Sequence, residues 1–186
     1  YRAMSEDVTT GWFRLGDPGQ AAAAGVPERA TVVVVGVERG GTSLVAAALH
    51  HLGVHMGEGL GATFEDPEVL NLFLRHPEGP PRAAFAELVA QRDSARAFWG
   101  WKVPSVVPEG LLDLVRQPRL VTVYRDSVAA AGRLAAAQHL APADGLRYLE
   151  QVRTEITRFA LAAQVPCLFV SYEKSLAAPE AFCREL

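Results

Sequence analysis

The sequence predicts an α/β fold, with a three-layer, doubly wound, mostly parallel sheet between two layers of helices. Short apolar runs alternate along most of the chain with longer runs that have helical periodicity. The four valines at residues 32–35 show no polar alternation, which is typical of a strand buried on both faces of a parallel sheet. Strands that alternate with helices in this way indicate βαβ units.

Strands are expected where apolar runs are bounded by turn residues. They are residues 32–35, 54–57, 98–103, 119–124 and 167–171. Aromatic side chains favour the strand at 98–103, and Pro104 ends it. The run at 54–57 is short and predicts only a brief strand.

Helices are expected between these strands, from periodicity and end signals. They are residues 44–52, 67–75, 82–96, 108–117, 126–139, 142–164 and 179–186. Asp66 can N-cap the second of them, with Pro67 at its first position. Pro108 can begin the fourth, and Pro118 lies just past its end.

We expect one α/β domain, residues 31–186, preceded by an N-terminal arm, residues 1–30. Gly and Pro interrupt the arm repeatedly, so it is predicted to be weakly structured. A chain of 186 residues can bury a sizeable core in one domain. The first residue is Tyr1 rather than Met, which is consistent with the sequence being a fragment of a longer protein.

Composition argues against several classes of function. The 18 Lys and Arg against 21 Asp and Glu give a net charge of −3, which argues against a nucleic-acid partner. No apolar run approaches the ~20 residues of a membrane span, so no membrane partner is expected. Cys167 and Cys183 are too few for a disulfide framework or a zinc site. They favour a reducing cytoplasm.

Residues 36–43 form a glycine-rich loop between the first strand and the first helix, which is the layout of a phosphate cradle. Gly36 and Gly41 have the spacing of a Walker A loop, but Thr42 stands where that loop has its lysine. Arg39 is the only cation in the loop. Without the lysine, a single 5′-phosphate bearing a sulfonyl group is a better ligand than a triphosphate. The alternative is a turn that merely joins strand to helix.

The run from Arg39 to Leu44 resembles the phosphosulfate-binding loop of sulfotransferases that use 3′-phosphoadenosine-5′-phosphosulfate (PAPS). The resemblance implies a P-loop-like sulfotransferase fold. It also implies that the 5′-phosphosulfate is held by Arg39, Gly40, Gly41, Thr42 and Ser43. Gly40 departs from the family's usual serine, which removes one hydroxyl and keeps the backbone donors.

Two segments at later strand ends also resemble this family. Arg125 and Asp126 are similar to the start of its 3′-phosphate segment, and the planar fork of an arginine suits a phosphate. Arg133 stands where the family usually has a serine, so it either binds the same phosphate or points to solvent. Tyr172 matches a tyrosine that lies near the adenine in relatives, with core packing as the alternative.

Three residues are expected to act on the transferred group. Lys102 resembles the lysine of the family's Lys-x-Pro segment, and with Arg39 it would stabilise the charge that builds during sulfuryl transfer. Pro104 stands where many cytosolic relatives have a histidine. The segment around Glu65 resembles one that carries a glutamate base in other branches, so Glu65 is expected to take the proton. His55 is the weaker alternative, and Glu65 could instead serve only the helix end.

The sequence therefore predicts a PAPS-dependent sulfotransferase that acts in line on an acceptor hydroxyl or amine, without a metal. The alternatives are a P-loop small-molecule kinase and a catalytically lapsed nucleotide-binding module. The sequence does not identify the acceptor, since acceptor pockets in folds of this kind are built from variable loops. We expect residues 57–61 and 77–81 to border it. Relatives often carry a further basic C-terminal segment that closes over the 3′-phosphate, and this sequence stops before it. Either the domain is truncated there, or Arg133 takes over that role, or the cofactor binds weakly.

Overall fold

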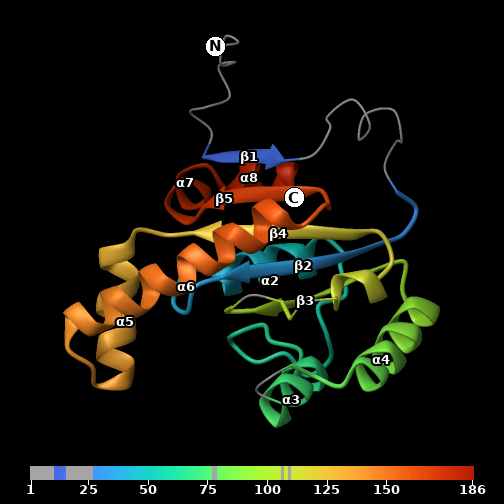
Figure 1. The fold of residues 1–186 in the computed structure, drawn as a ribbon. Coiled ribbons are helices and arrows are strands. Elements are labelled where there is room, and N and C mark those ends of the chain that lie inside the picture. The colour runs from blue at the N-terminus through green and yellow to red at the C-terminus, as the bar shows by residue number, and fades with distance from the viewer. Residues whose placement is uncertain (1–10, 16–26, 77–78, 106, 109) are drawn as a thin grey trace.

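The computed structural model describes residues 11–15, 27–76, 79–105, 107–108 and 110–186. They form a five-stranded sheet with helices on both of its faces (Figure 1). The expected α/β fold is confirmed. The strands are β1 (Trp12–Leu15), β2 (Ala30–Gly36), β3 (Phe98–Val103), β4 (Pro118–Tyr124) and β5 (Cys167–Ser171).

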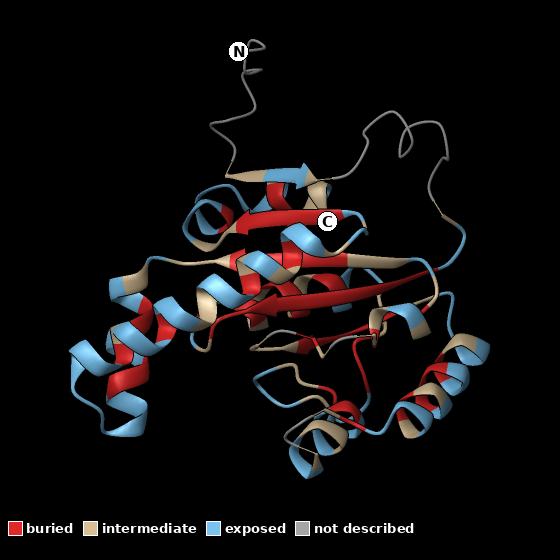
Figure 2. Cartoon of the chain, in the orientation of Figure 1, coloured by how far each residue is buried: buried red, intermediate tan, exposed pale blue. Residues whose placement is uncertain are grey.

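The sheet has the order β1-β5-β4-β2-β3. Every neighbouring pair is parallel except β1 with β5, which is antiparallel. β2 lies between β3 and β4, and every one of its residues is buried (Figure 2). The valine run therefore forms the central, fully buried strand that its composition predicts.

Seven α-helices are described. They are α2 (Thr42–His51), α3 (Pro67–Arg75), α4 (Arg82–Ala95), α5 (Ser127–Gln138), α6 (Pro142–Ala162), α7 (Tyr172–Ala177) and α8 (Pro179–Glu185). Alternate β2 side chains point to opposite faces of the sheet. Val33 and Val35 share a core with α4, α5 and α6, whereas Val32 and Val34 share one with α2 and α8. Among the described residues, no helix combines the length and the apolar character that crossing a bilayer requires.

The strand order reverses between β2 and β4. From β2 the chain passes to β3 on one side, and it then returns to form β4 and β5 on the other. The helix that follows β2 and the helix that follows β4 lie on opposite faces. In open parallel sheets, ligands bind at the carboxyl ends of strands where the order reverses in this way. Here those ends are Gly36 and Tyr124.

Several predicted elements differ from the observed ones. The helix expected at 108–117 is only a 3₁₀ turn, Leu112–Leu114. Gly110 and Gln117 have positive φ angles of 75° and 42°, which an α-helix does not accommodate. The brief strand expected at 54–57 is a single bridge between His55 and Trp99. The short helix α7 was not predicted, and α2 starts at Thr42 instead of residue 44.

The N-terminal arm is only partly described. Within it, Trp12–Leu15 is not weakly structured, because it forms β1 along β5. Phe13 stacks on Phe169 with ring centroids 4.6 Å apart. Residues 1–10 and 16–26 lie outside the described part of the chain.

Candidate functional site

The loop between β2 and α2 turns tightly over the end of the sheet. The Gly40 N–H donates to the Val37 carbonyl oxygen at 2.9 Å, and Arg39 between them has a φ of 58°. A Cβ on Gly40 would lie 2.6 Å from that carbonyl oxygen. This conformation therefore requires glycine at position 40, and the usual serine of the sulfotransferase loop would force Val37 to move.

Gly41 is the N-cap of α2 and has a φ of 92°. No described side chain caps this helix, so its first N–H groups lack the side-chain acceptor that most helix starts have. The helix also carries no acidic residue in its first turn. A helix start with these properties attracts an anion through its N–H groups and its dipole.

Arg125 and Tyr172 lie against this loop from the ends of two other strands. Arg125 follows β4 directly, and its Nη1 donates to the Arg39 carbonyl oxygen at 2.9 Å. Its guanidinium also stacks over the Tyr172 ring, 4.6 Å from the centroid. Tyr172 follows β5 directly, and its ring packs onto Gly41. The structure thus brings together the glycine-rich loop, the arginine expected at the 3′-phosphate and the tyrosine expected near the adenine.

Three polar contacts that support Arg125 were not predicted. The Nη2 of Arg153 donates to the Arg125 carbonyl oxygen at 2.9 Å. Asp126 N-caps α5, and its own N–H donates to Glu173 Oε1 at 2.9 Å. The Nε of Arg125 is buried and has no hydrogen-bond partner among the described residues. The arginine is therefore well fixed, and one of its donors has no acceptor in the described part of the chain.

Lys102 forms the second part of the site. It lies near the end of β3, opposite Val34, and its side chain is only 3% exposed. Its Nζ lies 2.8 Å from Glu65 Oε1 and 3.4 Å from Ser43 Oγ. Lys102 is therefore not a solvated lysine at the end of a strand. Glu65 does not serve only the end of the helix, because its carboxylate pairs with Lys102. A buried cation, a carboxylate and the start of α2 meet here.

Two predicted cations are less engaged. The Arg39 side chain is exposed, although its carbonyl oxygen binds Arg125. Arg133 is exposed on α5, about 9 Å along the helix from its first residue, Ser127. Exposure favours the solvent-facing interpretation of Arg133 over a phosphate contact.

His55, the alternative base, belongs to a separate buried cluster. Its Nε2 contacts Arg92, which also binds Asp66 and Glu68. Burial and the nearby Arg92 and Arg96 lower the pKa of His55. The ring nitrogen is thus already used within the protein. Arg92 was missed, although its position on the apolar stripe of α4 was a signal that could have revealed it.

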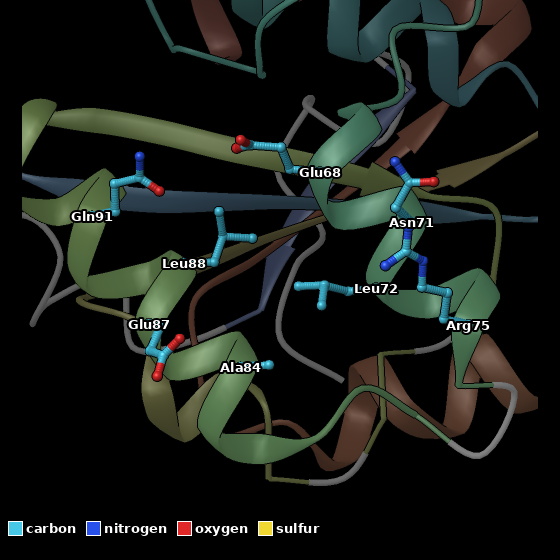
Figure 3. A pocket seen from close by; sticks show the side chains of 8 residues that line it. All are labelled: Glu68, Asn71, Leu72, Arg75, Ala84, Glu87, Leu88 and Gln91. Carbon is cyan, nitrogen blue, oxygen red and sulfur yellow. The ribbon is translucent and has the colours of Figure 1, made fainter.

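A groove of about 470 Å³ lies between α3 and α4, and none of the predicted site residues lines it (Figure 3). Leu72 and Leu88 face one another across it. The rest of its lining consists of Glu68, Asn71, Arg75, Ala84, Glu87 and Gln91. Of the expected acceptor borders, residues 77–78 lie outside the described chain, and no residue of 57–61 lines this groove.

Comparisons with known proteins give little help. No family model matches the sequence, and no curated protein matches it. Among solved structures, the chain is similar to the crystal structure of TT1252 from Thermus thermophilus. That similarity has a TM-score of 0.46 and 15% identity, over 86% of this chain and 98% of that chain. A likeness at this level does not indicate a function for this chain.

Proposed function

We propose that the protein is a cytoplasmic, PAPS-dependent sulfotransferase with a P-loop-like sulfotransferase fold. It would move a sulfuryl group to an acceptor hydroxyl or amine. The observation that carries the proposal is the meeting of Lys102, Glu65 and Ser43 at the start of an uncapped helix. These groups provide a cation for developing negative charge, a proton acceptor and anion-binding N–H groups at the carboxyl edge of the sheet.

The surrounding residues fit an anionic nucleotide. The start of α2 offers backbone donors, Tyr172 offers an aromatic ring, and Arg125 has a buried Nε without a described acceptor. In this proposal, the loop from Arg39 to Ser43 holds the 5′-phosphosulfate and Arg125 holds the 3′-phosphate. PAPS supplies the sulfuryl group when bound.

The Lys102–Glu65 pair suggests how the two residues divide the work. An anion at Ser43 would compete with Glu65 for the Lys102 ammonium group, because Lys102 contacts both residues. Lys102 would then stabilise the charge on the leaving oxygen. Glu65 would be free to accept the proton of the attacking hydroxyl or amine.

A catalytically lapsed nucleotide-binding module is the second candidate, and one observation favours it. Arg125 is already engaged with the Arg39 carbonyl oxygen and with Tyr172. A phosphate would have to share or displace these contacts. The kinase alternative is less favoured, since Thr42 replaces the Walker lysine.

The test is thermal stability with 3′,5′-adenosine bisphosphate, with ATP–Mg²⁺ and with 5′-AMP. A ligand at 100 times its Kd adds about 2.7 kcal/mol of stability. We expect the bisphosphate alone to stabilise the wild type and Arg133→Ala, and to lose this effect in Arg125→Ala. Stabilisation by ATP–Mg²⁺ alone would overturn the proposal in favour of a kinase. Bisphosphate binding without PAPS turnover on any of a panel of acceptors would favour the lapsed module.

A further inference from the structure

We infer that Arg92 is a positioning residue, which sets the Glu65–Lys102 pair by fixing the neighbour of Glu65. Its importance for catalysis rests on the proposed function, whereas its effect on the pair can be measured without it. Arg92 contacts neither Glu65 nor Lys102 through any described bond. It acts through Asp66, the residue that follows Glu65 in the chain.

Arg92 lies on the buried side of α4, on the same stripe as Phe85, Leu88 and Val89. Only 7% of the residue is exposed. A guanidinium at such a position is costly unless buried partners pair with it. The packing of α4 therefore requires that partners for the Arg92 guanidinium lie beside it.

The partners come from two segments that flank Glu65 in the sequence. Arg92 Nη2 donates to Asp66 Oδ2 at 3.0 Å, and the same nitrogen pairs with the Glu68 carboxylate. Its Nη1 donates to His55 Nε2. An arginine can only donate, so the His55 ring accepts at Nε2 and carries its proton at Nδ1. The lowered pKa of His55 agrees with this neutral form.

Asp66 has almost no freedom to move. Its side chain is 1% exposed, and its Oδ1 accepts from the Glu68 N–H at 2.9 Å as the N-cap of α3. The backbone of Gly57 closes its remaining side, because a Cβ there would lie 2.6 Å from Asp66 Cγ. Arg92, the start of α3 and Gly57 together fix Asp66, and with it the backbone on the C-terminal side of Glu65.

The residue before Glu65, Phe64, is fixed on the opposite face of the sheet. Phe64 has a φ of 53° and packs in the core that contains α2. Its ring stands edge-on to His50 with centroids 6.0 Å apart. Glu65 is therefore held between an anchor on α2 and an anchor on α4. Removal of the Arg92 anchor is expected to let the Glu65 carboxylate move away from Lys102.

The test measures the ¹⁵N and ¹H signals of the Lys102 Nζ group by NMR, assigned by their loss in Lys102→Arg. Glu65→Gln gives the signal of a lysine without its carboxylate. We expect Arg92→Gln to move the Lys102 signal toward that position. Asp66→Asn should do the same, and it keeps an N-capping side chain on α3 in case Arg92→Gln does not fold.

Arg116→Gln is the matched control. Arg116 is also a part-buried arginine bound near the end of α4, where it pairs with Asp93 and donates to the Arg96 carbonyl oxygen at 2.9 Å. It has no described link to Asp66, so its removal should leave the Lys102 signal in place. An unmoved signal in folded Arg92→Gln and Asp66→Asn, or an equal movement in Arg116→Gln, overturns the positioning role. Failure of the wild type to respond to 3′,5′-adenosine bisphosphate overturns only the proposed function.

Discussion

Tyr172 packs against Gly41 so closely that a Cβ on the glycine would lie 2.2 Å from Cδ2 of the ring. The same ring carries the guanidinium of Arg125, 4.6 Å from its centroid. One tyrosine therefore links the start of α2 to the arginine at the end of β4.

Gly41→Ala is expected to destabilise the protein for two reasons. A φ of 92° is strained for alanine, at a cost of about 1–2 kcal/mol, and the new methyl group would displace the Tyr172 ring. Urea unfolding measures the total loss. Gly53→Ala is the matched control, since Gly53 has a φ of 98° and open space around its Cβ position. We expect Gly41→Ala to lose at least ~1 kcal/mol more than the control, as overpacking does. Equal losses would contradict the Tyr172 contact.

Gly40→Ser introduces the serine that the resembled sulfotransferase loop usually has, but we expect it to destabilise this protein. The new Cβ would lie 2.6 Å from the Val37 carbonyl oxygen, and forced packing of this kind costs about 1–3 kcal/mol. Gly61→Ser is the control, because no atom lies within 4 Å of its Cβ position. The measurements are unfolding free energy and the Kd for 3′,5′-adenosine bisphosphate. A stable Gly40→Ser protein with tighter binding would contradict the close approach of Gly40 to the Val37 carbonyl oxygen.

The two partners of the Lys102–Glu65 pair are expected to differ in their effect on stability. The Lys102 side chain is 3% exposed, whereas that of Glu65 is 20% exposed. Glu65→Ala leaves a buried ammonium group with Ser43 as its one polar partner among the described residues. The loss of one partner of a buried pair costs roughly 3 kcal/mol. Lys102→Met leaves a carboxylate that water can reach, so its cost should be smaller.

Urea unfolding of both single variants and of the double variant tests this asymmetry. We expect the double variant to be more stable than Glu65→Ala, because no buried charge then remains at the pair. A milder effect of Glu65→Ala than of Lys102→Met would contradict the burial of Lys102.

His55 should make stability fall on the acid side of neutrality. Burial, Arg92 and Arg96 lower its folded pKa below the ordinary 6.5, so the folded state binds fewer protons than the unfolded state. The free energy of unfolding therefore rises with pH in the window below 6.5, and falls as the pH is lowered through it. We expect His55→Gln to weaken this dependence between pH 7 and pH 5.

The control for this measurement is His51→Gln, on the exposed side of α2. Readings stay above pH 5 because burial raises the pKa of Asp66 above its ordinary 3.8, and that group contributes with the opposite sign at lower pH. Parallel pH profiles for the wild type and His55→Gln would refute the assignment.

Local patterns were sufficient to predict the parts of the site that lie on consecutive elements. The valine strand, the glycine loop and the helix after it are neighbours in the chain, and Arg125 and Tyr172 each follow a clear apolar strand. The pairing of Glu65 with Lys102 could not be predicted, since it depends on how the segment before α3 crosses the end of β3.

Arg92 illustrates an intermediate case. A charged residue on the apolar stripe of α4 predicts a buried partner, but nothing local identifies that partner as Asp66. The prediction of a helix at 108–117 was wrong for a different reason. Its proline signals were present, yet Gly110 and Gln117 adopt positive φ angles that only the surrounding structure imposes.

The antiparallel strand β1 has a consequence for the order of folding. It pairs Trp12 with Val170, so one of the earliest described residues must wait for the fifth strand before it can bond. Closing so long a loop is entropically costly, and contacts of this kind form late. Until β1 docks, the outer edge of β5 has unpaired N–H and C=O groups that another chain could join. The period during synthesis before this docking is when the protein is most exposed to intermolecular strand pairing.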